Sequence, residues 1–564
     1  MFNKLISRFQ DKKTPSHPLA SDEGLNALMA DIPQSDPTRL LFDVDEILAG
    51  MDACAEEIGP VLALRALARL DQFSRPAVTE LLKRYLSAGG RQYLADSVWS
   101  ALDTHATHQF RYYRLFLLAP QELKSDDDKV RTARCAARAL MAWALRKKLQ
   151  RFRYRTPGPE LWQEAHELLQ ALNRLGLLKT RVVPYRNEGD SSPLGEYLIG
   201  LYLEFVPVGN VVPQQLEFAE SFLRASDGLD LNSQPDAMTT DWIDLGAANG
   251  PQRMKQDDPG GKSIRYCSVR KLRGALMRLA GQVKRPQDAP EWLAHVPATR
   301  EQIEGAVLIL MMHWAQAPPA RNKDRIAQKG ELRVVLGFGL ARRMIAAAHF
   351  ARMGRSLKYE GEDILRRYDE GRFGTVAAQD GVVTSPTEEV QPAPGGAPEI
   401  LRKLELAGDQ AQMERWTQVD SSSTGLGVVV PAVLPRHRIG SLICLREAEG
   451  LDWRLALIRR IGRDAANRPS IGIETLAWPS TCATAKPVGE ESAWTRVADG
   501  GHGWSDAIIV CREGKELILP AGAFVAGAEV DVRTEDGLWR VRLESLLDSG
   551  PDFERIEFTH ISRE

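Results

Sequence analysis

The six residues 420–425, with the sequence DSSSTG, offer the clearest chemistry in the chain. They lie between two predicted strands. Asp420 and Ser422 are two residues apart, so an extended backbone points both side chains to one side. There the two side chains could exchange hydrogen bonds with the edge of a base, and Gly425 permits a tight turn and a close backbone approach. Similar clusters also occur in ordinary hairpin turns.

The segments that follow extend this pattern. Arg438-Ile-Gly precedes a short apolar strand, 453–460 reads as a strand that ends in two arginines, and 471–476 begins Ile-Gly. Together with DSSSTG, these segments resemble the PilZ domain family over about residues 400–480. The resemblance implies a six-stranded β-barrel. In many members it also implies binding of the bacterial second messenger cyclic di-GMP.

One part of the family pattern does not match. Ligand-binding members carry two arginines with the spacing R-x-x-x-R on a loop before the aspartate. Such arginines can form paired hydrogen bonds with phosphate and with guanine. The expected window, 373–401, contains no arginine, and Arg459…Arg463 has the spacing but follows the aspartate. The nearest arginines are then Arg372, Arg402 and Arg415. The predicted nucleotide site is listed by residue as Asp420, Ser422, Gly425, Arg402 and Arg415.

The periodicity of apolar residues changes along the chain, and this change predicts the elements that must position the site. Helical spacing of apolar residues dominates the first 370 residues, and short β-branched runs dominate the end. We predict a multidomain α+β protein. Its parts are a flexible tail at 1–40, a helical domain at 41–180, a mixed, mainly helical domain at 181–372, a flexible linker at 373–398, a PilZ-like β-barrel at 399–480 and a second β domain at 492–564. The second β domain is interpreted either as a diverged barrel or as an extra structural domain.

Two glycine-containing motifs could bind phosphate but lack part of the required pattern. Residues 261–263, Gly-Lys-Ser, would end a P-loop only with a glycine at position 256, where Gln256 stands. Residues 337–339, Gly-Phe-Gly, lie between a predicted strand and a predicted helix, a place where phosphate can bind. Arg342 stands where a dinucleotide fingerprint has its third glycine, so we predict an ordinary turn.

The remaining histidines and basic residues are predicted to have structural roles, and no catalytic motif occurs. His105 and His108 have no further ligand cluster, so they are predicted to be surface residues of a helix, with no metal. The basic run 146–155 fits a helix C-terminus better than a nucleic-acid contact. Neither G-x-S-x-G nor H-E-x-x-H occurs, so no catalytic residue is predicted.

Composition narrows the class of protein. The chain of 564 residues has 73 Lys and Arg against 75 Asp and Glu, which argues against a polycation that binds nucleic acid by bulk charge. No apolar run approaches the length of a membrane-spanning helix. The six cysteines form no C-x-x-C pair, which favours a reducing cytoplasm.

The leading hypothesis is a non-enzymatic signalling effector of the bacterial cytoplasm. It would bind cyclic di-GMP through the PilZ-like domain, without a cofactor, and relay this to a helical region that binds a protein partner. One alternative is an interaction scaffold or adaptor with a degenerate barrel that binds no nucleotide. Another is an enzyme within residues 181–370, with the barrel as its regulator.

Overall fold

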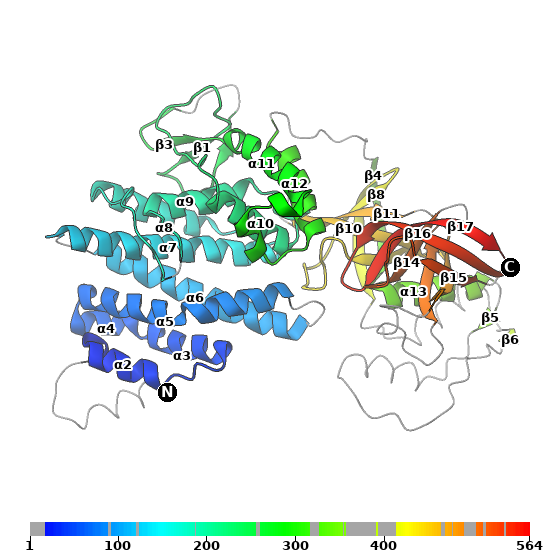
Figure 1. Ribbon diagram of the computed structural model, residues 1–564, viewed down its shortest axis with the longest axis horizontal. Helices are drawn as coiled ribbons and strands as arrows, with labels where there is room; N and C mark the ends of the chain where they lie inside the picture. Colours follow the sequence, from blue (N-terminus) through cyan, green and yellow to red (C-terminus); the bar gives the residue numbers. More distant parts are fainter. Residues whose placement is uncertain are drawn as a thin grey trace. The chain divides into compact units, whose positions relative to one another are not determined.

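The computed structural model describes residues 17–87, 92–119, 123–186, 188–254, 260–315, 326–352, 355–356, 391–392, 413–463, 468–476, 478–489, 504–510, 515–534 and 537–563. The chain divides into two compact units, Met1–Ala320 and Arg321–Glu564. The first is mainly helical, and the second consists mainly of strands (Figure 1). The predicted fold class, a helical region followed by an all-β module, is confirmed.

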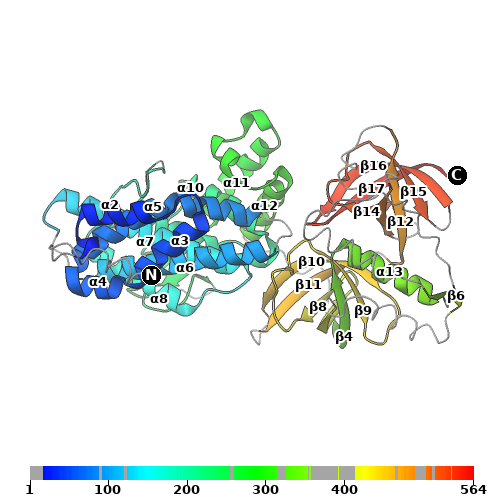
Figure 2. The same ribbon diagram turned by 90° about the horizontal axis from the view of Figure 1, so that it is seen from below.

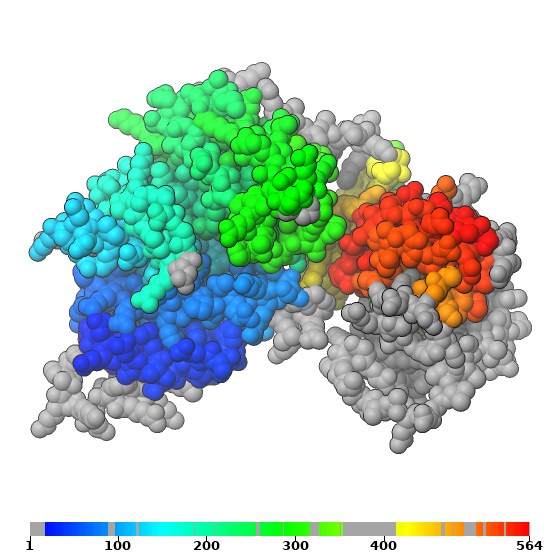
Figure 3. Space-filling view, viewed as in Figure 1, coloured from blue at the N-terminus to red at the C-terminus, as the bar shows by residue number. Residues whose placement is uncertain are grey.

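The first unit, whose surface colour changes from blue to green along the chain (Figure 3), is built from helices α2 to α12. They are α2 (Asp22–Asp31), α3 (Pro37–Ala49), α4 (Met51–Ile58), α5 (Pro60–Ser87), α6 (Gln92–Leu118), α7 (Asp126–Phe152), α8 (Pro159–Arg174), α9 (Pro193–Tyr202), α10 (Pro213–Arg224), α11 (Arg270–Val283) and α12 (Arg300–His313). A small antiparallel sheet joins them, with the order β2-β1-β3: β1 (Asp241–Asp244), β2 (Gln252–Arg253) and β3 (Ile264–Cys267).

The core of the helical unit is organised around α7. Trp143 of this helix is fully buried, stacks on Tyr197 of α9 with ring centroids 5.4 Å apart, and meets Trp162 of α8 edge-on at 5.3 Å. A Cβ at Gly200 would lie 2.3 Å from the Trp143 ring. A glycine at this position therefore allows α9 to approach α7 closely, and large aromatic surfaces are buried between the two helices.

The first closed barrel has the strand order β10-β11-β8-β7-β4-β9. Its strands are β4 (Ile326–Leu336), β7 (Glu414–Ser422), β8 (Gly425–Val429), β9 (Leu442–Glu447), β10 (Arg454–Arg463) and β11 (Pro469–Thr475). All neighbouring strands are antiparallel. Closure of the ring leaves no unpaired strand edge, so every strand contributes one face to the interior.

A second closed barrel follows, with the order β12-β13-β14-β17-β16-β15. Its strands are β12 (Ser480–Pro487), β13 (Ser505–Val510), β14 (Glu516–Pro520), β15 (Glu529–Thr534), β16 (Gly537–Ser549) and β17 (Phe553–Arg563). When the strands of each barrel are numbered from its own start, both rings have the cyclic order 5-6-3-2-1-4. The two barrels therefore share one connectivity.

Helix α13 (Phe338–Arg352) lies between the two barrels (Figure 2). It follows β4 after Gly337, whose φ of 92° is favourable for glycine. One hydrophobic cluster unites Phe338 and Met344 of the helix with Leu455 of the first barrel and with Ile508 and Phe553 of the second. The apolar face of α13 thus forms part of a core that both barrels share.

The observed boundaries differ from those predicted. The first barrel does not begin at 399, because its first strand, β4, lies at 326–336, within the predicted mixed domain. The predicted linker at 373–398 is therefore an insertion between two strands of one barrel. Apart from Gln391–Pro392 (β6), which pairs with Arg355–Ser356 (β5), it lies outside the described residues.

Three further boundaries change. The predicted tail at 1–40 contains α2 and the start of α3, although residues 1–16 lie outside the described part. The predicted domains 41–180 and 181–372 are not separate, because one compact unit runs to residue 320. The second β domain begins before 492, since β12 starts at residue 480.

Candidate functional site

The DSSSTG segment forms the hairpin between β7 and β8. Asp420 and Ser422 lie on β7, Gly425 starts β8, and Ser422 and Gly425 are paired across the turn. The Ser422 hydroxyl donates to the Gly425 carbonyl at 3.2 Å. The three predicted site residues are thus brought together at one end of the first barrel.

Gly425 is required by its neighbours. A Cβ at this position would lie 2.3 Å from the carbonyl oxygen of Ile473 on β11, whereas ordinary contacts begin near 3.4 Å. The backbone of β8 is therefore packed against β11 more closely than any side chain would permit. Glu474 of β11 is the residue paired with Gly425.

The other neighbour of the hairpin is β4, a strand that sequence analysis assigned to a different domain. Ala327 pairs with Asp420 and Ile326 with Ser421, and the Ser421 hydroxyl donates to Gln328 Oε1 at 2.8 Å. The start of β4 therefore lies beside the aspartate of the DSSSTG segment.

Two arginines missed by sequence analysis directly precede this strand. Residues 321–325 read Arg-Asn-Lys-Asp-Arg, so Arg321 and Arg325 have the R-x-x-x-R spacing, and Arg325 is joined to Ile326 by a peptide bond. Both arginines lie outside the described residues. The R-x-x-x-R spacing could have identified these two arginines. It was expected within residues 373–401, which lie in the insertion between β4 and β7, whereas Arg321 and Arg325 lie before β4.

The structure does not place Arg402 or Arg415, the two basic residues assigned to the site, at the hairpin. Arg402 lies outside the described residues. Arg415 is on β7, but it is paired with Arg333 near the other end of the strand, and its side chain is 68% exposed. Five residues of extended strand separate it from Asp420, about 17 Å. The structure does not bring Arg415 to the hairpin.

Arg459, the first arginine of the later R-x-x-x-R, is held by carboxylates. Its Nε donates to Glu474 at 2.5 Å, and its two terminal nitrogens donate to the two oxygens of Asp548 at 2.7 and 3.0 Å. Asp548 belongs to β16 and also accepts from Arg555 of β17 at 2.9 Å. Arg459 therefore links the strand beside Gly425 to the second barrel.

The glycine turn at 337–339 is occupied by protein. The Phe338 amide, at the start of α13, donates to Asp552 Oδ2 of the second barrel at 2.6 Å. A carboxylate at this position is favoured by the helix dipole. The prediction of a turn between a strand and a helix is confirmed, and this carboxylate stands where a phosphate would bind.

A buried cluster anchors the loop between β8 and β9. Glu414, at the start of β7, accepts hydrogen bonds from His437 Nε2 (2.9 Å), Arg436 Nε (2.6 Å) and Trp416 Nε1 (2.8 Å). Burial alone would raise the pKa of Glu414, but the hydrogen bond and charge of His437, with the bonds from Trp416 and Arg436, lower it to about 2.

His105 is not a surface residue, contrary to the prediction for this pair. It is 1% exposed, with Nδ1 2.8 Å from Asp45 Oδ1 and Nε2 3.0 Å from the Ser74 hydroxyl. These three residues have the order of a Ser-His-Asp triad. However, Ser74 is fully buried and Gln109 Nε2 lies 2.8 Å from the same histidine nitrogen. The arrangement is a buried polar network that substrate cannot reach.

The basic run at 146–155 ends α7, as predicted, and its charges are neutralised by glutamates. Lys147 and Arg151 form ion pairs with Glu204, and Lys148 does so with Glu217 and Glu220. Lys147 lies 3.7 Å from the Trp162 ring centroid, and desolvation lowers its pKa to about 7. These cations are buried and do not form a surface for nucleic acid.

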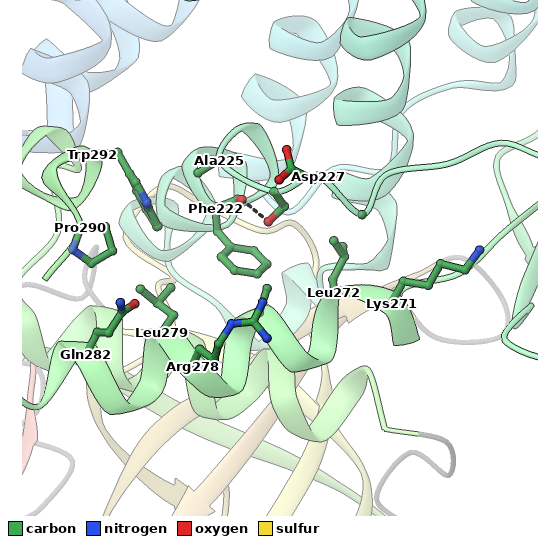
Figure 4. Close-up of a pocket in the computed structure, with 13 residues that line it drawn as sticks. Phe222, Ala225, Asp227, Lys271, Leu272, Arg278, Leu279, Gln282, Pro290 and Trp292 are labelled. Atoms are coloured by element: carbon green, nitrogen blue, oxygen red, sulfur yellow. Dashed lines mark hydrogen bonds between the residues drawn. The ribbon is translucent and has the colours of Figure 1, made fainter. Parts of the chain in front are cut away.

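A pocket of about 270 Å³ lies between α10 and α11 (Figure 4). Phe222, Leu279 and Trp292 provide its apolar lining. Lys271 extends away from them, to Asp230 and to Asp236 at 2.9 Å. Asp227, Lys271 and Arg278 add charged groups to the lining. Within the described ranges, no cluster of metal-ligating residues occurs, and no helix has the length and apolarity to cross a bilayer.

Two family models match the chain. Residues 23–230 match "Cyclic-di-GMP receptor FimW, N-terminal domain", and residues 262–482 match "Cyclic-di-GMP receptor FimW, middle PilZ domain". The second match includes β4, both arginines of 321–325 and the DSSSTG hairpin. Neither a curated protein nor a solved structure matches the chain. The second barrel lies almost entirely beyond the matched residues.

Proposed function

The chain belongs to the PilZ family of cyclic-di-GMP receptors, and from this we propose that it binds cyclic di-GMP at the β7–β8 hairpin of its first barrel, in the bacterial cytoplasm. The proposed site comprises Asp420, Ser422 and Gly425 together with Arg321 and Arg325. The pairing of Ala327 with Asp420 carries the proposal, because Arg325 precedes Ala327 by only two positions in the sequence.

The chemistry of these residues suits the ligand. An arginine guanidinium presents paired N–H donors that match two oxygens of a phosphate, or O6 and N7 of guanine. A carboxylate such as Asp420 accepts from the N–H donors on the opposite edge of guanine. The Ser422 hydroxyl adds a short polar group, and Gly425 leaves the turn free of a side chain.

The position of the arginines suggests how binding is relayed. Arg321 and Arg325 lie in the segment that joins the helical unit, which ends at Ala320, to β4. A ligand held by both arginines and the hairpin would order this segment. We propose a non-enzymatic effector in which this ordering changes how the helical unit binds a protein partner.

The alternative of a barrel that binds no nucleotide depended on the missing R-x-x-x-R. Because Arg321…Arg325 directly precedes β4 in the sequence, that reason no longer applies. Arg402 and Arg415 are then not needed as substitutes.

Calorimetric titration of cyclic di-GMP into the full-length protein tests the proposal. Wild type should bind saturably, and Asp420→Ala and Arg325→Ala should each weaken binding tenfold or more, since charged hydrogen bonds contribute about 1.5–3 kcal/mol. Arg463→Ala, from the other R-x-x-x-R, is the matched control and should bind as wild type. Absence of binding by wild type, or unchanged binding by Asp420→Ala, would exclude this site.

A further inference from the structure

Strand register extends the proposed site across the face of the barrel. Ala327 of β4 is paired with Asp420 of β7, Asp420 with Gly427 of β8, Gly427 with Gly472 of β11, and Gly472 with Arg460 of β10. These five residues form one transverse row over five neighbouring strands. In antiparallel strands, directly paired residues point to the same face.

The row lies on the outer face of the barrel. On either side of Arg460, Ile458 and Ile461 are buried, as are their partners Ile473 and Ile471 on β11. Residues that alternate with inward-facing ones point outward. A bulge between Ile458 and Arg460 re-aims the strand here.

Arg460 differs from its neighbour Arg459. Arg459 donates to Glu474 and Asp548, as described above. Arg460 is exposed and, among the described residues, makes no ion pair or side-chain hydrogen bond. Within the described part of the chain, the fold therefore gives Arg460 an outward position without an ionic or hydrogen-bonded partner.

Between Arg460 and Asp420 the row carries no side chains, because Gly472 and Gly427 occupy the two central strands. Three inter-strand spacings separate the ends of the row, about 14 Å. Neither side chain spans this gap alone, but a flat molecule lying on the two glycines would reach both. Asp420 would accept from its donors, and Arg460 would donate to its acceptors.

We propose that Arg460 is a further ligand residue of the barrel and that it binds the O6 and N7 acceptors of a guanine lying across Gly427 and Gly472. The inference rests on the proposed function, since it extends the same site. Guanine presents these two acceptors on one edge, which an arginine can meet with two parallel hydrogen bonds. Adenine presents an amino donor in place of O6, so Arg460 also favours guanine over adenine.

The test compares three variants in calorimetric titrations of the full-length protein with cyclic di-GMP. Arg460→Ala removes the guanidinium, Arg460→Lys keeps the charge but loses the paired donors, and Arg415→Ala removes an exposed arginine from the far end of β7. A paired arginine–guanine contact corresponds to about fivefold to 150-fold in affinity. Arg460→Ala and Arg460→Lys should both lose affinity in this range, and Arg415→Ala should lose less than twofold.

Three outcomes would overturn the proposal. If Arg460→Ala binds within twofold of wild type while Asp420→Ala has lost binding, the site is right but Arg460 is not part of it. If Arg460→Lys binds as tightly as wild type, or if Arg415→Ala loses as much affinity as Arg460→Ala, positive charge alone decides the affinity and the paired contact is excluded. If Asp420→Ala binds as wild type, the proposed function itself fails. Cyclic di-AMP is the second probe: its weak binding should change little in Arg460→Ala.

Discussion

Substitution of Gly425 by alanine should separate two strands at the proposed site. The new Cβ would lie 2.3 Å from the Ile473 carbonyl oxygen, and ordinary contacts begin near 3.4 Å, so β8 and β11 must move apart by roughly 1 Å. The hydrogen bond from the Thr475 amide to the Thr424 carbonyl, 3.1 Å long, lies next to this contact and would be stretched. The obstacle is backbone, so no rotamer change relieves it.

The expected cost is about 2 kcal/mol, since forced overpacking usually costs about 1–3 kcal/mol. For a unit of roughly 200 residues this corresponds to a melting temperature lower by about 4–8 °C. Scanning calorimetry of the full-length chain measures it, because the helical and β units can unfold in separate transitions. Affinity for cyclic di-GMP should fall as well, since Gly425 pairs with Ser422.

Gly462→Ala is the matched control on the same barrel. An added Cβ there meets nothing within 4 Å, so this variant should melt close to wild type. If Gly425→Ala melts within about 1 °C of Gly462→Ala, the close approach of β8 and β11 does not constrain this site and the reasoning is refuted.

Three further predictions concern other parts of the structure. Asp552→Ala should destabilise the β unit by about 1 kcal/mol, because the Phe338 amide loses its acceptor, and equal melting of variant and wild type would contradict this. His105→Ala should destabilise the helical unit by about 3 kcal/mol, because its buried partners Asp45 and Ser74 lose their hydrogen-bond partner. An unchanged melting temperature of this unit in scanning calorimetry would contradict the prediction. Glu414 has a folded pKa of about 2 against an ordinary 4.5, so its charge stabilises the fold above pH 4.5 and this contribution is lost as pH falls toward 2. Denaturation of wild type and Glu414→Gln at several pH values should show a difference that disappears over that window.

The strands of the first barrel from β7 to β11 could be predicted because their residues alternate or form short β-branched runs between turns. Its first strand could not be placed, because more than 70 residues, helix α13 among them, separate β4 from β7. Local periodicity does not say which distant strand is a partner, and the R-x-x-x-R at 321–325 was missed for the same reason. Proximity to the DSSSTG hairpin exists only in three dimensions.

The burial of certain polar residues could not be predicted from the sequence either. The sequence predicts His105 to be a surface residue of a helix, and it predicts Lys147 to belong to a basic helix C-terminus. The structure places His105 between Asp45 and Ser74, and Lys147 between aromatic rings and Glu204. Asp45, Ser74 and Glu204 lie 31 to 60 residues along the chain from the side chain that each contacts, so no local pattern predicts these contacts.

The core shared by α13 and both barrels has a practical meaning for fragments of this protein. A fragment that stops near residue 482, where the family match ends, would remove Ile508 and Phe553 from the face of α13 and leave Phe338 and Met344 uncovered. Such a truncation would be expected to aggregate or to lose cooperativity. The second barrel, although it carries no recognised motif, then stabilises the first by covering the apolar face of α13. The two barrels together are therefore the smallest fragment in which we expect the nucleotide site to be studied.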